Sequence, residues 1–419
     1  MLRKTEGIIS NPPFVGRRQR NKLQSVEVAK FFTYKDVDYV ACWYKKAADF
    51  ITGTESAFVS TNSITQGEQI AAVWKPLIDA GVKINFAYTT FKWQSESESM
   101  AAVHCVIIGF AMKSRRKKFI YDGELKIPAK NINAYLVDAE DVFIEHRTKP
   151  ICDVPEMCMG NMELGNGHLI INADEYEDFI TSEPAAKKFI KKLLGAEEFI
   201  NGKKRWCLWL KDCPLDEIEK MPLVMERVNA CKDFRMNGSA DRKKFADIPH
   251  LFRDKHNPQN FIVVPRVSSE NRRYIPIDFL NSDTIVTDRV QMIPDAQIYH
   301  FGILTSSVHM AWTRAVCGRL KSDYNYSKNI VYNNFIWCSP TDAQKKLIET
   351  TAQKILDVRA DFDGKTLAYL YGKDMPDELR DAHKENDRAV MAAYGFDENM
   401  TEFEIVSELM TLYKNFSQK

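Results

Sequence analysis

The chain has 419 residues, of which 45% are hydrophobic and 27% charged, with a formal net charge of +1. This is the composition of a water-soluble protein of two or three domains, and its apolar runs are too short to span a bilayer. No signal peptide is visible, and the nine scattered cysteines form no CxxC pair, so we expect a cytoplasmic protein without a disulfide framework, a structural zinc site or another metal.

The first unusual stretch is "IISNPPFVG", which starts at Ile8. We expect Ile8 and Ile9 to form the buried end of a strand. Pro12 and Pro13 then stop any ladder or helix and hold the backbone extended. The stretch therefore predicts a stiff turn at the carboxyl edge of a sheet, where open α/β folds bind ligands.

The polar groups of this turn suit a planar base. The Asn11 side-chain oxygen and the Pro12 carbonyl can both accept hydrogen bonds, and Phe14 offers a flat apolar face. Two acceptors beside an aromatic ring would hold an exocyclic amine while the ring stacks on the base. The alternative is a proline-rich loop with a capping asparagine.

Further elements follow in regular order. The spacing of apolar residues predicts, in turn, a helix over 37–51, a strand over 57–64, a helix over 67–81 and strands over 82–91 and 101–112. The order strand, helix, strand, helix, strand, strand matches the second half of a doubly wound, Rossmann-like sheet that ends in a hairpin-like pair. The basic stretch "MKSRRKKF" then marks the exit from this domain.

The pattern changes near residue 150. Short, weakly periodic segments predict a mixed β-rich domain, in which 260–280 forms two strand-like runs around a charged turn and 306–320 is helical. From Ser339 the chain is mostly helix, with Ser339 as N-cap, Pro340 first and Asp342 third. We therefore expect an α/β plus α+β protein of three parts. These parts are 1–150, a partial catalytic domain; 151–337, a recognition domain; and 338–419, a helical region.

Several motifs together resemble the catalytic half of an adenine-N6 DNA methyltransferase: "NPPFVG", "DYVACWYKKAADFI", "AFVSTNSITQGEQ", "FKW" and "AAVHCVIIGF". More specifically, the chain resembles the MmeI-like family of type IIL restriction–modification enzymes. The stretches "INAYLVDAEDV", "EFINGKKRWCLWL", "PRVSSENRRYIPIDFL", "ILTSSVHMAWTRAVCGRLKSDYNYS" and "VYNNFIWC" resemble that family's target-recognition region. The resemblance covers nearly the whole chain.

The resemblance implies roles for residues of the first domain. A methyl group would pass from S-adenosylmethionine to N6 of an adenine flipped out of duplex DNA, without a metal. In the motif Asn11–Pro12–Pro13–Phe14, the first two residues would accept hydrogen bonds from the amine and Phe14 would stack on the base. Phe91 would be the second aromatic wall, with Trp93 as the alternative. Plain core packing is the other interpretation of both rings.

The cofactor half of such an enzyme lies upstream of its Asn-Pro-Pro motif and contains a Gly-rich turn. Only ten residues precede Asn11, and the Gly-rich stretch 160–167 follows no strand–helix–strand pattern. We therefore expect the carboxyl-terminal part of a larger enzyme, as a truncated gene product, one half of a split gene or an engineered piece. It would lack its own cofactor site and the family's nuclease domain. A separate or upstream cofactor-binding half would be a partner.

Residues suited to reading DNA gather in "PRVSSENRRY". Arginine reads guanine, asparagine reads adenine, glutamate accepts from cytosine, and serine suits phosphates or bases. The candidates are Arg266, Ser268, Ser269, Glu270, Asn271, Arg272 and Arg273, with Arg319, Lys321, Tyr324 and Tyr326 as backbone contacts. An ordinary solvated turn is the alternative. The basic clusters 115–118 and 242–244 are either further contacts or plain surface, and His309 is expected to be a core residue.

Three functions remain open at this point. The first is the catalytic-loop half and recognition region of a site-specific adenine-N6 methyltransferase that acts on double-stranded DNA. The second is a DNA-binding specificity module without catalysis that acts with a cofactor-binding subunit. The third is an RNA or protein methyltransferase, because Asn-Pro-Pro-aromatic motifs also serve other amines. The long recognition region disfavours the third.

Overall fold

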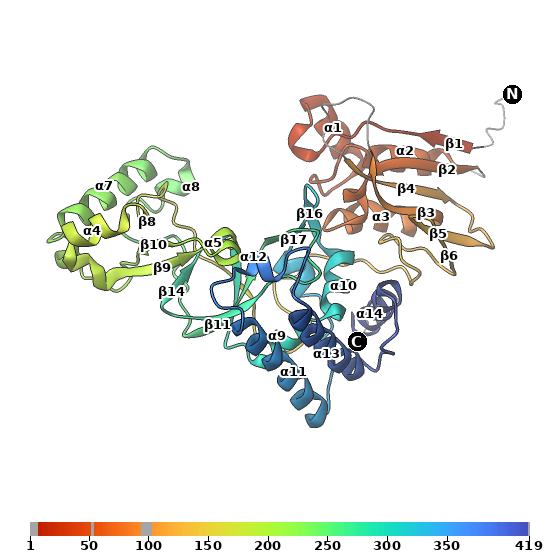
Figure 1. Cartoon of the computed structure of the whole chain (residues 1–419). Coiled ribbons are helices and arrows are strands. Elements are labelled where there is room, and N and C mark those ends of the chain that lie inside the picture. The colour runs from red at the N-terminus through yellow and green to blue at the C-terminus, as the bar shows by residue number, and fades with distance from the viewer. Residues whose placement is uncertain (1–6, 52–53, 94–102, 418–419) are drawn as a thin grey trace. The chain divides into compact units, whose positions relative to one another are not determined.

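A computed structural model describes residues 7–51, 54–93 and 103–417 of the chain (Figure 1). By packing, the chain forms two compact units, each built from separate segments. Unit 1 comprises residues 1–152, 311–339 and 394–419, and unit 2 comprises 153–310 and 340–393. The helical carboxyl-terminal region is therefore divided between the units. The predicted division of the chain into the parts 1–150, 151–337 and 338–419 stays a prediction.

Unit 1 is built on a six-stranded sheet with the order β1-β2-β4-β3-β5-β6. The elements of unit 1 are β1 (Gly7–Ser10), η1 (Arg17–Gln19), α1 (Lys22–Phe31), α2 (Ala41–Phe50), β2 (Glu55–Thr61), η2 (Asn62–Thr65), α3 (Gln69–Asp79), β3 (Lys83–Trp93), β4 (Val103–Ala111), β5 (Lys118–Asp122), β6 (Leu125–Ala129), β16 (Gly318–Leu320), β17 (Asp323–Asn325), η4 (Lys328–Tyr332) and α14 (Glu402–Ser417). Strand β1 pairs with β2 in parallel, and β3 pairs with β5 in parallel, whereas β4 is antiparallel to both of its neighbours. The carboxyl ends of β1, β2, β3 and β5 therefore lie at one edge of the sheet.

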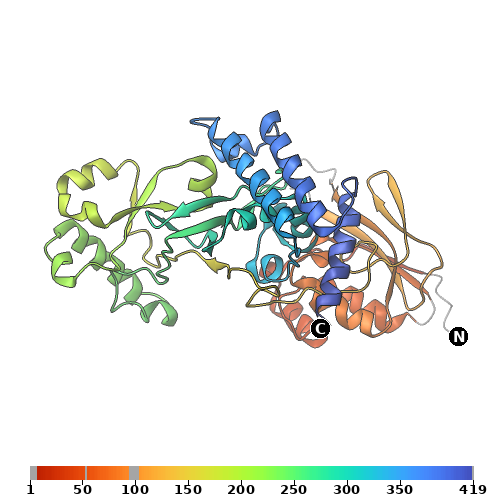
Figure 2. The same ribbon diagram turned by 90° about the horizontal axis from the view of Figure 1, so that it is seen from below.

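Helices α2 and α3 cover this sheet (Figures 1 and 2). The apolar residues of α3 recur at helical spacing, and the fully buried Trp74 packs its ring edge-on against Tyr44 of α2, at 5.3 Å between centroids. Tyr44 in turn stacks on Phe110 of β4 at 5.2 Å. These contacts explain why helices and strands form where the sequence predicts them over 37–112, although the strand predicted over 57–64 ends at Thr61, where η2 follows, and residues 101–102 lie outside the described ranges. The first helix begins at Ala41 rather than Val37 because a turn precedes it.

Two expectations for unit 1 are wrong. Ile9 is 88% exposed, and β1 is an edge strand of the sheet, with β2 as its one paired neighbour among the described residues. The basic stretch after β4 does not leave the domain, since Lys118 begins β5 and is only 4% exposed. Burial lowers the pKa of Lys118, and its ammonium group donates to Asn131 Oδ1 at 3.2 Å.

Unit 2 contains two four-stranded sheets, ordered β14-β9-β10-β8 and β13-β11-β15-β7. Its elements are β7 (Cys158–Met159), β8 (Ile170–Asn172), α4 (Tyr176–Ser182), η3 (Pro184–Phe189), β9 (Ile190–Leu194), α5 (Ala196–Asn201), β10 (Arg205–Leu208), α6 (Leu215–Ile218), α7 (Pro222–Met236), α8 (Ala240–Lys243), β11 (Asn260–Pro265), β12 (Val267–Ser268), β13 (Asp278–Asn281), β14 (Thr284–Val286), β15 (Val290–Pro294), α9 (Ile298–Leu304), α11 (Asp342–Ala360), α12 (Leu367–Leu370) and α13 (Asp377–Tyr394). Helix α10 (Ser307–Val316) crosses the division between the units.

The helix α7 is absent from the sequence prediction. Its buried face consists of Val224, Val228, Cys231 and Arg235. The last of these is a charged residue at a position where helical periodicity predicts an apolar one, and Arg235 is 0% exposed. Because one position of its buried face is an arginine, the amphipathic pattern of α7 is not visible in the sequence.

Two further boundaries differ from the prediction. Helix α10 ends at Val316, and Gly318–Leu320 pairs with Asp323–Asn325 as a hairpin instead of continuing the helix. The N-cap of α11 is Thr341 rather than Ser339, because the Thr341 hydroxyl accepts from the Gln344 backbone N–H at 3.3 Å and the Gln344 side chain accepts from Thr341 N–H at 2.9 Å.

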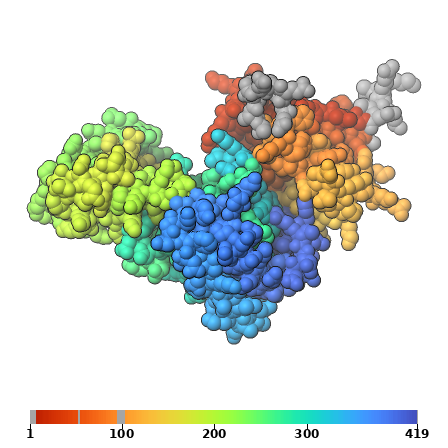
Figure 3. Space-filling model, viewed as in Figure 1, coloured from red at the N-terminus to blue at the C-terminus, as the bar shows by residue number. Residues whose placement is uncertain are grey.

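Helices α11 and α13 lie side by side in both ribbon views and form an exposed surface of unit 2, blue in Figure 3. The Thr351 hydroxyl of α11 donates to Asn386 Oδ1 of α13 at 3.1 Å, and Asn386 Nδ2 donates to the Gly302 carbonyl of α9 at 2.8 Å. Buried polar bonds thus fix these helices to the rest of the unit.

Within the described ranges, no helix combines the length and the apolar character needed to cross a membrane. All nine cysteines lie in those ranges and carry free thiols.

Candidate functional site

The loop after β1 presents an open amide. Asn11 follows the last residue of the strand and is exposed, Pro12 is buried, and Phe14 is half-buried. Among the residues that the structure describes, none forms a hydrogen bond with the Asn11 side chain. The amide oxygen is therefore accessible to a ligand at the carboxyl edge of the sheet, where the sequence predicts it.

The rest of this loop is held rigidly by its neighbours. Val15 N–H donates to the Pro13 carbonyl at 3.2 Å, and Tyr39 N–H donates to the Val15 carbonyl at 3.0 Å. The backbone N–H of Arg17 donates to Asp38 Oδ1 at 3.2 Å. The loop is thus tied at two points to the segment that leads into α2.

Asp38 is a positioning residue that sequence reasoning misses. Its second carboxylate oxygen accepts from the Ser63 hydroxyl and from Gln69 Nε2 at 3.3 Å, which links the loop to the residues after β2. In the sequence, an aspartate before a helix is indistinguishable from an ordinary cap. Next to it, a hydrogen bond to the Glu27 carboxylate raises the pKa of Tyr39 to about 12.

Phe91 and Trp93 lie at the end of β3, on the same edge of the sheet. Phe91 is half-buried, Trp93 is 41% exposed, and their ring centroids are 6.3 Å apart. Strands β2 and β4 lie between β1 and β3, which separates the two strand ends by roughly 14 Å. Within the described ranges, no ring contact joins Phe14 and Phe91.

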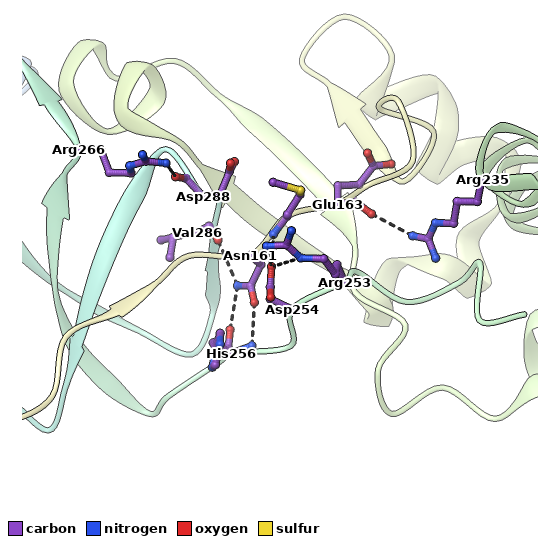
Figure 4. A network of polar contacts seen from close by, with 10 residues as sticks. Asn161, Glu163, Arg235, Arg253, Asp254, His256, Arg266, Val286 and Asp288 are labelled. Atoms are coloured by element: carbon purple, nitrogen blue, oxygen red, sulfur yellow. Dashed lines mark hydrogen bonds and ion pairs between the residues drawn. The ribbon is translucent and has the colours of Figure 1, made fainter. Parts of the chain in front are cut away.

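The Gly-rich stretch 160–167 does not fit a cofactor phosphate or carboxylate. The Glu163 carboxylate accepts backbone N–H bonds from Gly165 at 2.8 Å, Gly167 at 3.0 Å and Leu169 at 3.0 Å. An anionic ligand would need those same donors. Asn161 ties the stretch to neighbouring chain segments, donating to His256 O at 2.9 Å and accepting from His256 N at 2.7 Å (Figure 4).

Within the described ranges, these backbone donors of the Gly-rich stretch are therefore engaged by Glu163 and not open to a cofactor. In the same ranges, no group of three or more His, Cys, Asp or Glu side chains is placed to hold a metal ion.

The charged turn after β12 presents several polar side chains. Asn271 and Arg273 are exposed, and Ser269, Glu270 and Arg272 are half-buried. The turn is held internally, since Arg272 N–H donates to the Ser269 carbonyl at 3.1 Å. The candidate base-reading residues thus lie together on one short segment of unit 2.

The segment around this turn is not a simple hairpin ribbon. Strands β11 and β13 pair only as far as Val263 with Asp278, while Val264 and Pro265 pair with β15. The residues between the turn and β13 form no strand, and Tyr274, Ile275 and Ile277 are buried in the core of unit 2.

Burial removes two predicted contacts from the DNA-binding set. Ser268 is 1% exposed and accepts from Arg272 Nη1 at 3.4 Å, and Tyr326 is 2% exposed. Neither side chain is available to a duplex in this structure. Arg266 is engaged as well, since its Nη1 donates to the Asp288 carbonyl at 3.1 Å (Figure 4).

The hairpin of β16 and β17 presents Lys321 at its tip. Lys321 is exposed and adopts a left-handed backbone conformation with φ of 57°. Arg319 instead folds back over the Tyr324 ring, 4.0 Å from its centroid, and Tyr324 is buried. Of the predicted phosphate contacts in this hairpin, Lys321 is therefore the residue most open to solvent.

In the basic clusters 115–118 and 242–244, some side chains already contact other groups of the protein. Arg115 forms an ion pair with Glu55, while Arg116 and Lys117 are exposed. Arg242 lies over the Phe234 ring, 4.2 Å from its centroid. His309 is 1% exposed and burial lowers its pKa to about 3, as expected for a core histidine.

Comparisons with known proteins agree on one family. The family model "MmeI, DNA-methyltransferase domain" matches residues 3–122, "MmeI, target recognition domain" matches 138–339, and "MmeI, C-terminal domain" matches 340–419. Among curated proteins, DNA methyltransferase A of Bacillus subtilis (strain 168) is 40% identical over 423 residues, which cover 98% of this chain and 48% of that protein.

A solved structure gives the same result. The type IIL restriction–modification enzyme MmeI in complex with DNA is 41% identical, with a TM-score of 0.89, over 99% of this chain and 57% of that chain. The present chain thus spans about half the length of the relatives that it matches. From the three consecutive matches and the shared fold, the chain belongs to the MmeI-like family of type IIL restriction–modification proteins.

Proposed function

We propose that this chain carries the catalytic loop and the target-recognition region of a site-specific DNA adenine-N6 methyltransferase, cytoplasmic and part of a restriction–modification system. The observation that carries the proposal is the exposed Asn11 amide on a loop stiffened by Pro12 and Pro13. The family membership supports DNA as the substrate, because the relatives are named as a DNA methyltransferase and as an enzyme in complex with DNA.

The loop supports one chemical role. Asn11 Oδ1 and the Pro12 carbonyl accept hydrogen bonds from the two N6 protons of a flipped adenine, and Phe14 stacks on its ring. These contacts orient the amine nitrogen toward the methyl donor and stabilise the positive charge that develops as the nitrogen is methylated. S-adenosylmethionine would supply the methyl group. Phe91, or alternatively Trp93, forms the second wall.

We propose that a cofactor-binding half joins the sheet beside β1. One side of β1 pairs with β2, and within the described ranges its other side has no strand partner. Ile9 on this strand is 88% exposed, although isoleucine at a strand end is usually buried. An open strand edge with an exposed apolar side chain favours addition of a further strand.

The direct test is the identity of the methylated base. The chain is incubated with its cofactor-binding half, labelled S-adenosylmethionine and DNA that contains the target, and the nucleosides are then separated by mass spectrometry. We expect N6-methyladenine. A label on cytosine would refute the assignment of adenine. Specific DNA binding without any label would favour a specificity module that has no catalysis of its own.

We expect Glu270 and Arg272 to determine one base pair of the target. Glu270→Ala or Arg272→Ala should change the preference at a single position, at a cost of roughly 1–3 kcal/mol for the cognate base pair. Selection from a randomised duplex library with each variant measures this. If both variants return the wild-type consensus, the turn is not the reading element, and the loop 237–244 becomes the next candidate.

Lys321 should behave differently, as a phosphate contact. We expect Lys321→Ala to weaken binding to all duplex sequences alike and to lower the salt slope of log K by about one unit. Fluorescence anisotropy over a series of salt concentrations measures the slope. Lys232→Ala, at an exposed lysine of α7, is the control that should leave the slope unchanged. A change of base preference in Lys321→Ala would contradict the phosphate role.

A further inference from the structure

The carboxyl-terminal helices α11 and α13 contact the segment that follows the charged turn. Asp387 of α13 is 7% exposed, and both oxygens of its carboxylate accept hydrogen bonds. The Tyr274 hydroxyl donates to Asp387 Oδ2 at 2.6 Å, and the Ser307 backbone N–H donates to Oδ1 at 2.6 Å. Asp387 therefore joins three elements of unit 2: the end of the turn, α13 and the first residue of α10.

Tyr274 is the residue immediately after Arg273, the last residue of the turn. Its side chain is completely buried, and its ring stacks on His383 of α13, with 4.1 Å between centroids and 14° between planes. The Arg273 guanidinium group lies over the same ring, 5.6 Å from its centroid. The carboxyl end of the turn thus has a fixed position and a fixed direction relative to α13.

A second contact fixes the same segment four residues later. Arg359 of α11 is 9% exposed, and its Nη1 donates to the Ile277 carbonyl at 2.9 Å. Its Nη2 donates to Asp278 Oδ2 at 2.6 Å, an ion pair of which the arginine side is almost fully buried. The stretch 274–277 is therefore held by side chains from both helices, and strand pairing begins only at Asp278, which pairs with Val263 of β11.

This arrangement matters for base reading because direct readout depends on geometry. A side chain reads a base only if its backbone is held within about 0.5 Å of the productive position. The turn is held internally by the bonds from Arg272 to the Ser269 carbonyl and to the Ser268 hydroxyl. At its carboxyl end, Tyr274 and the residues that hold it add a connection to the core of unit 2.

We propose that Asp387 and Arg359 are positioning residues for DNA specificity, which act through Tyr274 and Asp278 on the reading turn. The inference rests on the proposed function, because it requires the turn to read DNA. It gives the carboxyl-terminal helices a role in target choice in addition to packing. Neither residue touches the duplex.

The main test is Tyr274→Phe, which removes the hydrogen bond to Asp387 and keeps the stacked ring. Asp387→Asn is the second variant, since it keeps the shape but leaves one acceptor oxygen for two donors. We expect the ratio of cognate to non-cognate affinity to fall roughly tenfold in each, the cost of about one base contact. Affinity for non-cognate duplex should stay within about twofold, because phosphate contacts supply it.

Two controls separate positioning from stability. Ile355→Val trims a fully buried residue of α11 by one methyl group and so lowers the stability of the unit, and it removes none of the hydrogen bonds that hold the segment 274–278. Lys354→Ala removes a half-exposed ion pair with Glu385 between α11 and α13. Both should keep the wild-type affinity ratio. Hydrogen exchange should become faster over 269–277 in Tyr274→Phe and stay unchanged there in Ile355→Val.

The outcomes are distinguishable. If the wild-type chain shows no preference for any duplex sequence, the proposed function fails and this inference fails with it. If the wild type is specific but Tyr274→Phe and Asp387→Asn keep both its affinity ratio and its exchange rates, only the inference is overturned. An equal loss of ratio in Ile355→Val would also overturn it, because the effect would then follow stability alone.

Discussion

Asn11→Ala is expected to lower the rate of methyl transfer by roughly 100-fold or more while leaving duplex binding nearly unchanged. The reason is that, under the proposed function, the Asn11 amide oxygen acts on the flipped base and not on the groove. Its side chain is exposed, and among the described residues nothing else hydrogen-bonds to it, so removing it leaves the loop intact. Single-turnover methylation by the chain with its cofactor-binding half measures the rate, and anisotropy measures the binding.

The matched control is Gln19→Ala, at an exposed residue of η1 in the same unit. This variant should methylate at the wild-type rate. Wild-type turnover in Asn11→Ala would remove Asn11 from the site. A parallel loss of DNA binding in that variant would instead assign Asn11 a structural role.

Arg235→Ala is expected to destabilise unit 2 by about 3–5 kcal/mol. The guanidinium group is completely buried and donates to five backbone carbonyls, those of Glu163, Leu164, Phe245, Ile248 and Leu251, at 2.7–3.2 Å. Removing it leaves these buried acceptors without donors and opens a cavity below α7. Figure 4 shows the bond to the Glu163 carbonyl.

Urea denaturation of the chain, followed by near-ultraviolet circular dichroism, measures this loss. Arg235→Lys should recover only part of the stability, because three ammonium donors cannot reach five acceptors. Lys232→Ala, at an exposed position of the same helix, should change the free energy of unfolding by less than about 0.5 kcal/mol. A midpoint for Arg235→Ala close to that of the wild type would show that the carbonyls find other partners.

The sequence alone was sufficient for the elements of unit 1 between 37 and 112, because their apolar residues follow one clear period and the ring cluster of Tyr44, Trp74 and Phe110 buries that face. The family was recognisable for a related reason. The residues Asn11 to Phe14 are neighbours in the sequence, and the motif is defined by these residue types alone. The motif can therefore be recognised without knowledge of the fold.

Only the tertiary structure decided which polar residues face solvent. Ser268 and Tyr326 have side chains suited to DNA, yet both are buried, and Lys118 of a basic cluster is a strand residue. Burial depends on partners that lie far away in the sequence, and local pattern does not contain those partners. For the same reason, the sequence does not show that Arg235 of α7 is buried.

What the sequence determines and what only the tertiary structure determines differ in how far apart the interacting residues lie in the sequence. Periodicity, turn chemistry and the Asn11 motif are properties of neighbouring residues, and the sequence by itself determined them. The bond from Tyr274 to Asp387 spans 113 residues and that from Arg359 to Asp278 spans 81 residues. Only folding brings such pairs within hydrogen-bonding distance, and so only the tertiary structure identified what holds the segment that follows the charged turn.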